Sequence, residues 1–373
     1  MLENIFDPNN YIFWILVISI LAVIIFFILR TFFVHFKFVY PNAKFEAIGN
    51  PFITEKELSR IVASRDITNF RELLNISKDY NVTGDTTYEL QRSLEHHFIQ
   101  TIEMMRKDSS KKMNDFFDIY LEKLDYYLIK NILKKRLVDE KIDKNIANES
   151  ILQTTKKLLS KLIDSKKEDI PLILKNHGFT KEVIEVFSAE KIDFLDLDTI
   201  MDKHIINKFM QLKVPRKCEK AKQKFVNYLI DTVNIKNVLR AKHLGYDRDS
   251  CIKLFLGEGQ EIAYWKFKQM CEADSLSDVV STLVGTLHYN ILKDALENYE
   301  KEKSVQTLEN ALDVRFLKLI EEISVENYIT IGPTLRFIVS KEFEIKNLKI
   351  IAKGVGEEFS ADLIQKFVIM EDK

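Results

Sequence analysis

The sequence is poor in the residues that make turns. Its 373 residues include only 10 glycines and 6 prolines, whereas β-sandwiches and barrels need turn residues every few positions. Long stretches rich in Leu, Ile, Lys and Glu separate the few breakers, and these residues form helices readily. With 46% hydrophobic and 30% charged residues, the chain has enough apolar side chains for packed cores. We therefore expect an all-α protein, long enough for two or three domains.

A strong excess of charge is also missing. The 55 basic and 56 acidic residues give a net charge of −1, and proteins that bind nucleic acid usually carry a basic excess. We therefore expect no nucleic-acid partner. The three cysteines, Cys218, Cys251 and Cys271, form no Cys-x-x-Cys pair. An odd number without a disulfide framework is typical of a reducing cytoplasm, so we interpret the thiols as free and structural.

The sequence contains no recognisable catalytic motif. GEGQE, from Gly257 to Glu261, is rich in glycine but acidic, and it lacks the Lys-Ser/Thr of a phosphate-binding loop. The adjacent His96 and His97 would point about 100° apart on a helix and do not easily share a metal ion. No His-Glu-x-x-His pattern and no nucleophile elbow occurs. We therefore predict that the chain is not an enzyme and has no catalytic residue, cofactor, metal site or small-molecule substrate.

One segment is long and entirely apolar. Residues 11–29, YIFWILVISILAVIIFFIL, contain no charge over 19 positions, and as a helix they span roughly 28 Å, close to the hydrocarbon thickness of a bilayer. A cleavable signal peptide is the alternative. However, the first ten residues contain Glu3 and Asp7 and no Lys or Arg, whereas a signal peptide begins with basic residues. We therefore predict a retained transmembrane helix at residues 11–36.

The residues that flank this segment predict its orientation. Tyr11 and Trp14 suit one membrane interface, and Arg30 and Lys37 lie on the C-terminal side. By the positive-inside rule, residues 1–10 are extracytoplasmic, and the large C-terminal body lies on the cytoplasmic face of the cell membrane. The lipid membrane is thus an expected partner.

The body repeats a short pattern three times. Ile-Lys-Asn occurs in LDYYLIKNILKK, DTVNIKNVLRAK and KEFEIKNLKIIA, where the asparagines are Asn131, Asn237 and Asn347, spaced 106 and 110 residues apart. Each asparagine lies on or beside the apolar stripe of an expected helix. A buried amide must be hydrogen-bonded, so we interpret these residues as structural contacts to a neighbouring helix or loop. A role as a ligand is the alternative.

A second marker alternates with the first. ASRDITNFRELL, SKKEDIPLILKN and CEADSLSDVVSTL each place a short acidic, turn-like start before an apolar helical run. Their aspartates, Asp66, Asp169 and Asp274, are 103 and 105 residues apart. Self-similarity at a fixed period indicates one structural unit used several times. We therefore predict three similar helical modules of about 105 residues, with boundaries at 37–139, 140–245 and 246–373.

The start of the body resembles a known family. YPNAKFEAIGNPFITEKELSRIVASRDITNFRELL is similar to the start of the C subunit of archaeal A-type ATP synthases, whose eukaryotic counterpart is the d subunit of the V-type proton pump. Lys44 keeps the charge of the family's first arginine, whereas Glu46 replaces the second. NIKNVLRAKHLGYDRDSCIKLFLGEGQEI and EIKNLKIIAKGVGEEFSADLIQKFV are similar to the later repeats. The positions that match at the start are Tyr40, Asn42, Ala43 and Ala47.

The resemblance implies a structural role in a rotary machine. Members of this family are all-α, with three similar helical modules that form a funnel around a pseudo-threefold axis. They lie on the cytoplasmic face of the membrane rotor ring, receive the central shaft in the funnel and carry torque without catalysing a reaction. We therefore expect a non-catalytic central-stalk subunit of an ion-translocating A-type/V-type ATP synthase, with ring and shaft subunits as partners. A membrane-anchored helical scaffold or receptor unrelated to the ATPase is the alternative.

Two further expectations concern the two ends of the body. With the helix around Asn42, four asparagine-marked helices alternate with three aspartate-started segments, so we expect the last helix to pack against residues 40–50. The membrane segment is a departure from the family, whose members usually begin near the Tyr-x-Asn-Ala pattern. A span that turns with the ring from outside would strike the stator. We therefore hypothesise that residues 11–36 lie in the lumen of the ring; an anchor during assembly is the alternative.

Overall fold

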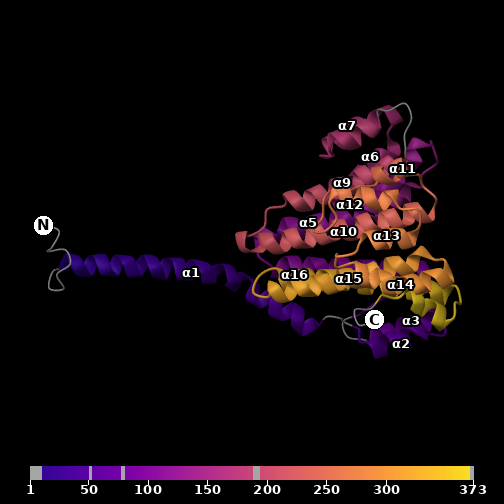
Figure 1. The fold of residues 1–373 in the computed structure, drawn as a ribbon. Helices are drawn as coiled ribbons and strands as arrows, with labels where there is room; N and C mark the ends of the chain where they lie inside the picture. Colours follow the sequence, from indigo (N-terminus) through magenta and orange to yellow (C-terminus); the bar gives the residue numbers. More distant parts are fainter. Residues whose placement is uncertain (1–10, 50–52, 77–79, 188–193, 370–373) are drawn as a thin grey trace.

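The computed structural model in Figure 1 describes residues 11–49, 53–76, 80–187 and 194–369. About 79% of the chain is helical, and the described residues contain no strand. The prediction of an all-α fold is therefore confirmed. A helical body occupies one end of the molecule, and a single long helix extends from it (Figure 1).

Paired long helices form the frame of the body in the described ranges. The first pair is α4 (Thr87–Asp108) and α5 (Asn114–Leu137), the second is α9 (Phe194–Gln211) and α10 (Glu219–His243), and the third is α15 (Val305–Glu326) and α16 (Gly332–Gly356). Residues 109–113, 212–218 and 327–331 connect the two helices of each pair, and we call them the first, second and third hairpin turns. Short connections of this kind join helices that pack as antiparallel neighbours.

Shorter helices precede each pair. α2 (Glu55–Val62) and α3 (Ile67–Ile76) come before the first pair, and α6 (Gln153–Asp164), α7 (Ile170–Asn176) and α8 (Lys181–Val186) come before the second. α11 (Arg248–Lys253), α12 (Tyr264–Glu272), α13 (Leu276–Thr282) and α14 (Tyr289–Glu302) come before the third, and α17 (Ala361–Phe367) follows it. The predicted module boundaries at 139 and 245 thus fall just after the ends of α5 and α10.

Local sequence explains several helix starts. Thr54 and Thr86 each form a capping box with a glutamate three residues later, Glu57 before α2 and Glu89 before α4. Each box satisfies backbone N–H groups that the first turn of a helix leaves unpaired. Pro333 lies in the first turn of α16, where its missing N–H has no intrahelical partner to lose.

Aromatic side chains join the three helix pairs in the core. The ring of Phe116 on α5 lies 6.1 Å from that of Phe209 on α9 and 6.4 Å from that of Phe225 on α10. Phe225 in turn lies 6.3 Å from Phe316 on α15. All four rings are buried, and truncating a buried phenylalanine typically costs about 3–5 kcal/mol. The pairs are therefore parts of one packed body.

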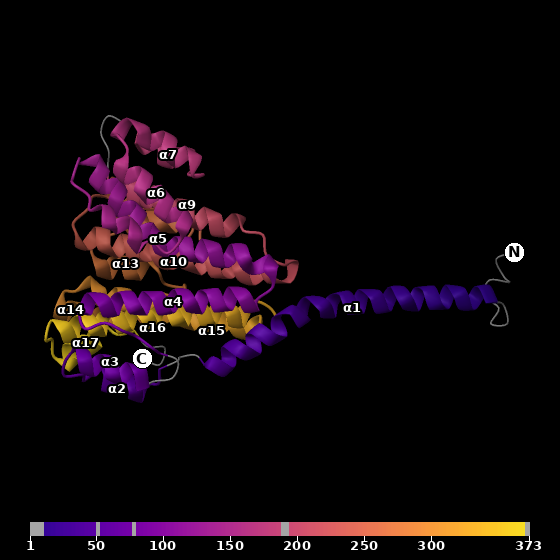
Figure 2. The ribbon, with the colours of Figure 1, turned by 180° about the vertical axis from the view of Figure 1, so that it is seen from behind.

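Helix α1 (Tyr11–Ile48) has 38 residues, and its N-terminal part extends from the body as a rod (Figure 1). Within the described ranges it is the one helix long and apolar enough to cross a membrane, and its apolar window is entirely exposed. The helix continues past the predicted span into the body, where it contacts α16 and α4. Pro41 lies inside it and removes a backbone N–H, which bends a helix. Figure 2 shows α1 bending as it reaches the body.

Candidate functional site

The C-terminal end of α1 is fixed to the third helix pair. Phe45 is fully buried and stacks on Phe337 of α16, with 4.9 Å between the ring centroids. The side-chain amide of Asn42 is buried and donates two hydrogen bonds to the third hairpin turn, to the carbonyl oxygens of Tyr328 at 2.8 Å and Thr330 at 2.9 Å. The first long helix of the chain therefore packs beside α16, which carries Asn347.

Helix α1 also reaches the end of α4, which leads into the first hairpin turn, and the second hairpin turn. The ammonium group of Lys44 pairs with Asp108, the residue before the first turn, at 2.6 Å. Lys217 in the second turn lies 2.9 Å from Nε2 of His35, and Nδ1 of His35 lies 3.2 Å from the carbonyl oxygen of Ile329 in the third. A neutral His35 that is protonated on Nδ1 satisfies both contacts. The end of α4 and the second and third turns thus lie beside α1 where it leaves the body, and we call this region the turn end (Figure 1 and Figure 2).

The turn end is rich in exposed cations. Two apolar side chains of the third turn are also exposed there, Tyr328 by 52% and Ile329 by 60%. Basic residues near a membrane span favour its cytoplasmic side and attract anionic lipid headgroups. The exposed lysines in and beside the first two turns are Lys107, Lys111, Lys112, Lys213, Lys217 and Lys220.

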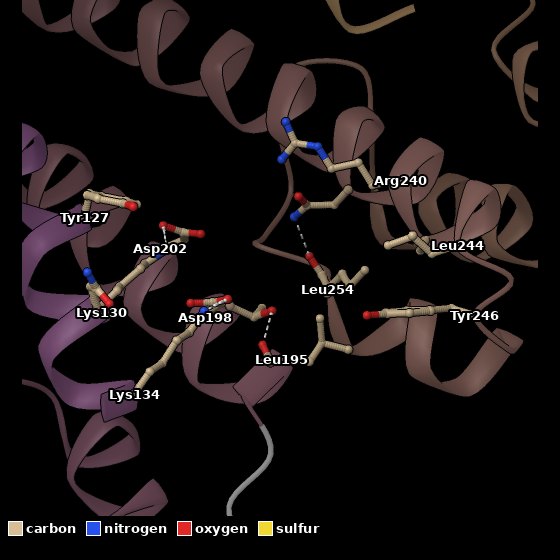
Figure 3. A pocket seen from close by; sticks show the side chains of 14 residues that line it. Tyr127, Lys130, Lys134, Leu195, Asp198, Asp202, Arg240, Leu244, Tyr246 and Leu254 are labelled. Atoms are coloured by element: carbon tan, nitrogen blue, oxygen red, sulfur yellow. Dashed lines mark hydrogen bonds and ion pairs between the residues drawn. The ribbon is translucent and has the colours of Figure 1, made fainter. Parts of the chain in front are cut away.

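A pocket of about 520 Å³ lies toward the opposite ends of α5 and α10, between these helices and α9 (Figure 3). Inside it, Lys130 pairs with Asp202 at 2.5 Å. Burial raises the pKa of Asp202, and the neighbouring ammonium of Lys130 opposes this effect. The lining also includes exposed apolar surface, because Tyr127 is 73% exposed, Leu244 66% and Tyr246 37%. The pocket therefore combines ion pairs with apolar contact area.

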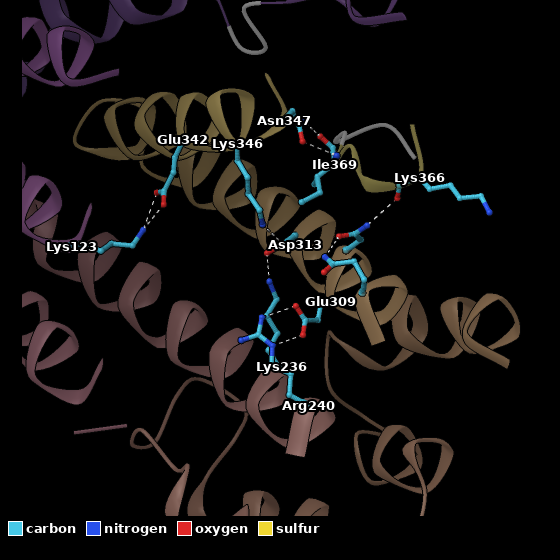
Figure 4. Close-up of polar contacts among 12 residues, drawn as sticks. Lys123, Lys236, Arg240, Glu309, Asp313, Glu342, Lys346, Asn347, Lys366 and Ile369 are labelled. Carbon is cyan, nitrogen blue, oxygen red and sulfur yellow. Dashed lines mark hydrogen bonds and ion pairs between the residues drawn. The ribbon is translucent and has the colours of Figure 1, made fainter. Parts of the chain in front are cut away.

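Two of the four predicted asparagine markers line this pocket. Asn131 and Asn237 both contribute to it, and the amide of Asn237 donates to the carbonyl oxygen of Leu254 at 3.3 Å. Asn347 lies elsewhere and exchanges two hydrogen bonds with the backbone of Ile369, at 2.6 and 2.9 Å (Figure 4). With Asn42 at the base of α1, the four markers occupy three separate places.

The predicted aspartates lie at helix starts but make different contacts. Asp66 accepts a hydrogen bond from the backbone N–H of Asn69 at the start of α3, at 2.8 Å. Asp169 directly precedes α7 without a side-chain cap bond. Asp274 precedes α13, but the capping side chain there is Ser275. These residues mark similar positions along the chain rather than a common site.

The predicted membrane flanks are exposed along the rod of α1. Tyr11 is 73% exposed and Trp14 is 54% exposed, both far from the body. Arg30 and Lys37 are exposed nearer to the body. Their order along the helix matches an apolar span between an aromatic end and a basic end.

Sequence reasoning missed several buried carboxylates, and two of them each bind more than one backbone N–H group. Asp125 on α5 accepts hydrogen bonds from the backbone N–H groups of residues 151 and 152, at 2.8 and 3.0 Å. Asp231 on α10 accepts three such bonds from residues 260–262, each at 2.9 Å. Burial raises the pKa of both carboxyl groups, that of Asp231 to about 6, although the N–H donors act in the opposite direction. Each carboxylate therefore fixes the segment that follows its own helix.

The spacing of these aspartates in the sequence could have identified them. Asp125 and Asp231 are 106 residues apart, the same interval that separates Asn131 from Asn237. Each aspartate stands six residues before its asparagine. The same kind of contact is therefore made twice at the repeat interval, each time to a segment near the start of the next predicted module.

Ion pairs connect α15 to the long helices on either side (Figure 4). Asp313 on α15 pairs with Lys236 on α10 and, at 3.2 Å, with Lys346 on α16. Glu309, also on α15, accepts from the guanidinium group of Arg240 at 2.6 Å. Burial lowers the pKa of Lys236, and Asp313 opposes this effect. Because both carboxylates are almost fully buried, losing one partner would leave a poorly solvated charge.

The described part of the chain contains no group of three or more His, Cys, Asp or Glu side chains that could hold a metal ion. His204 and His288 are buried, and burial lowers the pKa of each to about 4. The three cysteines are free and buried.

Comparison with known proteins identifies the family. The sequence model described as "ATP synthase (C/AC39) subunit" matches residues 41–367. The chain is 25% identical to the C subunit of the A-type ATP synthase of Methanobrevibacter smithii, over 92% of this chain and 90% of that protein. It is 28% identical to the C subunit of the A-type ATP synthase of Desulfurococcus sp. (strain SY), over 88% and 89% of the two chains. The resemblance seen in the sequence is confirmed: the chain belongs to the ATP synthase (C/AC39) subunit family.

Proposed function

We propose that this chain is the central-stalk subunit that joins the rotor shaft to the membrane rotor ring of an A-type/V-type ATP synthase. Membership of the family over residues 41–367 is the observation that carries this proposal, and the relatives are named as C subunits of A-type ATP synthases. The chain is accordingly a structural, non-catalytic subunit. Its role is to transmit torque between shaft and ring during ATP synthesis or ion pumping.

The body consists of three modules at residues 37–139, 140–245 and 246–373, arranged as a funnel about a pseudo-threefold axis. Two observations support this division. Each proposed module ends in, or contains, one pair of long helices preceded by shorter ones. The contact made by Asp125 recurs at Asp231, one repeat interval later. Repeated units that share contacts with their successors are typical of proteins built from internal repeats.

The turn end faces the membrane and the rotor ring, on the cytoplasmic side. The departure of α1 from this end supports the assignment, because the apolar rod has to enter the bilayer there. The exposed lysines around the first two hairpin turns support the cytoplasmic orientation. The ring subunits and the lipid membrane are therefore the partners at this end.

The central shaft docks at the opposite end, at the pocket between α5, α9 and α10. The pocket offers exposed apolar side chains beside half-buried ion pairs, and interfaces commonly combine apolar anchors with a polar rim. Its position at the far ends of α5 and α10 separates it from the turn end by the length of these helices. With the shaft bound at the pocket and the ring bound at the turn end, torque would pass through the body along its long helices.

The body is suited to carry such a load. The buried aromatic rings join all three helix pairs, and interiors packed this way resist deformation. Ion pairs add connections between pairs, since Lys123 on α5 contacts Glu342 on α16 at 2.8 Å and Arg240 on α10 contacts Glu309 on α15 (Figure 4). Rotation of one helix pair against another would break these contacts.

A pull-down of the tagged full-length chain in detergent tests the proposal. We expect the nucleotide-binding subunits, the shaft and the ring subunit to co-elute with ATPase activity, as identified by mass spectrometry and an ATPase assay. Elution of the chain alone, or with unrelated membrane proteins, would contradict the proposal. The membrane-anchored scaffold would then be the better account.

A pair of variants tests the docking of the shaft. Tyr127→Glu and Leu244→Glu place charges on the apolar lining of the pocket, and losing such an anchor commonly costs about 2 kcal/mol or more, roughly 30-fold in affinity. We expect the shaft to be lost from the pull-down while the ring subunit stays. Ile76→Glu is the matched control, because Ile76 is 82% exposed on α3, outside the pocket. Equal loss in the control and the pocket variants would argue against this docking surface.

A further inference from the structure

The contacts at the base of α1 specify where the apolar rod points. Lys44 reaches the residue before the first hairpin turn, and His35 reaches the second and third turns. When the ends of three helix pairs are grouped about an axis, a helix displaced to one side contacts one or two of these ends. Helix α1 contacts the end of α4 in the first pair, the second turn and the third turn, so it lies between the ends of all three pairs. The rod therefore leaves the body near the centre of the turn end, not at its edge.

The direction of the rod is held on both sides of its bend. Pro41 frees the carbonyl of Lys37 and would let the upper helix swing. However, His35 lies on the N-terminal side of the proline and contacts the second and third hairpin turns. Asn42 lies on the C-terminal side and also donates to the third hairpin turn. Contacts that bracket the bend fix the upper helix relative to the turn end.

The surface of the rod suits an apolar environment on every side. Large side chains all round it are exposed, such as Ile18 by 62%, Phe26 by 61% and Phe27 by 58%. The one hydroxyl between Tyr11 and Arg30, that of Ser19, donates to its own helix at 2.8 Å. Tightly packed membrane helices use stripes of small residues, and between these two positions Ser19 and Ala22 are the small residues present. The rod is therefore built to be surrounded by apolar groups without a close-packed seam.

From this placement we propose that residues 11–36 lie inside the lumen of the rotor ring, surrounded by the apolar inward-facing side chains of the ring subunits. This inference rests on the proposed function, which sets the turn end on the ring. A rod at the centre of the turn end then lies along the rotation axis. Its length of about 39 Å as a helix is sufficient to cross the bilayer within the ring. A rod on the axis turns with the ring without meeting the stator, whereas a rod outside the ring would collide with it.

Cryo-electron microscopy of the intact ATPase complex tests the inference. Complexes with the full chain and with a chain lacking residues 1–33 are compared; the truncation keeps His35, Asn42 and Lys44. We expect a rod of density in the lumen with the full chain and its loss with the truncated chain. A rod outside the ring, or lumen density that is the same in both complexes, would overturn the inference.

Photocrosslinking of the full-length complex is an independent measurement. Phe26→p-benzoylphenylalanine places the probe in the middle of the rod, and the same probe at Ile76, on the exposed side of α3, is the control. We expect adducts with the ring subunit from position 26 and none from position 76. Adducts with a stator membrane subunit, or no ring adduct from position 26, would overturn the inference. Failure of the ATPase subunits to co-purify would instead contradict the proposed function.

Discussion

Replacement of Asn42 by aspartate tests the contact that fixes α1 to the body. The amide of Asn42 is 4% exposed and donates to the carbonyl oxygens of Tyr328 and Thr330. In Asn42→Asp, a carboxylate oxygen would face two carbonyl oxygens at these distances. Two hydrogen bonds are lost, each worth about 1 kcal/mol, and an unpaired buried charge adds about 2 kcal/mol. We expect the free energy of unfolding to fall by about 4 kcal/mol at pH 7.

Companion variants separate the lost hydrogen bonds from the added charge. Asn42→Ala loses the same two bonds without a charge, so we expect a fall of about 2 kcal/mol. A protonated aspartic acid can donate one O–H bond. Lowering the pH toward about 4 should therefore recover part of the loss in Asn42→Asp and none of the loss in Asn42→Ala. Asn298→Asp is the matched control, because it makes the same charge change at an exposed position on α14.

The assay is urea unfolding of the purified full-length chain in detergent, followed by far-UV circular dichroism at several pH values. The free energy of each variant is compared with that of the unmodified chain at the same pH, so that other titrating groups cancel. Equal stability of Asn42→Asp and Asn298→Asp at neutral pH would refute the reasoning. An identical pH dependence for the aspartate and alanine variants would refute it as well.

Three other measurements follow from the buried polar contacts. A Cβ atom at Gly259 would lie 1.9 Å from Oδ1 of Asp231. Gly259→Ala should therefore reduce the free energy of unfolding by about 3 kcal/mol and lower the melting temperature. An unchanged melting temperature would contradict this geometry. Burial lowers the pKa of His288 from 6.5 to about 4, which means that the folded protein favours the neutral imidazole. The stability that neutral His288 contributes is therefore present above pH 6.5 and is lost as the pH falls through 4. Between about pH 7 and 4 the unmodified chain should lose about 3 kcal/mol more than His288→Leu in urea unfolding, and equal losses would exclude this role. Asp313→Asn leaves Lys236 without its charge partner, so the free energy of unfolding should fall by about 3–5 kcal/mol. If the lost ion pair is the cause, the double variant Asp313→Asn, Lys236→Met should recover most of this stability.

Much of the fold could be predicted because helical periodicity and hydrophobicity are local properties. The scarcity of glycine and proline indicated an all-α protein, and the described residues are helical without strands. Residues 11–29 identified the apolar rod by length and composition, and α1 continues from Tyr11 to Ile48. The segment from Tyr40, together with the two later repeats in the same order, indicated the family, which the match over residues 41–367 confirms. Each of these inferences depends on residues that are close in the sequence.

The contacts that connect the helices could not be predicted in the same way. The 106-residue interval was visible at Asn131 and Asn237, but the stronger contacts at that interval belong to Asp125 and Asp231. Carboxylates are common on exposed helix faces, so an aspartate within a helix gives no local sign that it will be buried. Its burial depends on where the following segment packs. The asparagine pattern therefore pointed to the right helices without identifying every residue that holds the modules together.

The sequence by itself determined that this protein is helical, that it carries one apolar rod, and to which family it belongs. Composition, periodicity and ordered similarity are properties of the sequence that can be read without the fold. Only the tertiary structure decided that the ends of the three helix pairs meet beside the base of that helix. His35 and Ile329 are 294 residues apart and Asn42 and Thr330 are 288 apart. Such contacts depend on how the side chains of whole helices pack against each other, and no short segment contains that information.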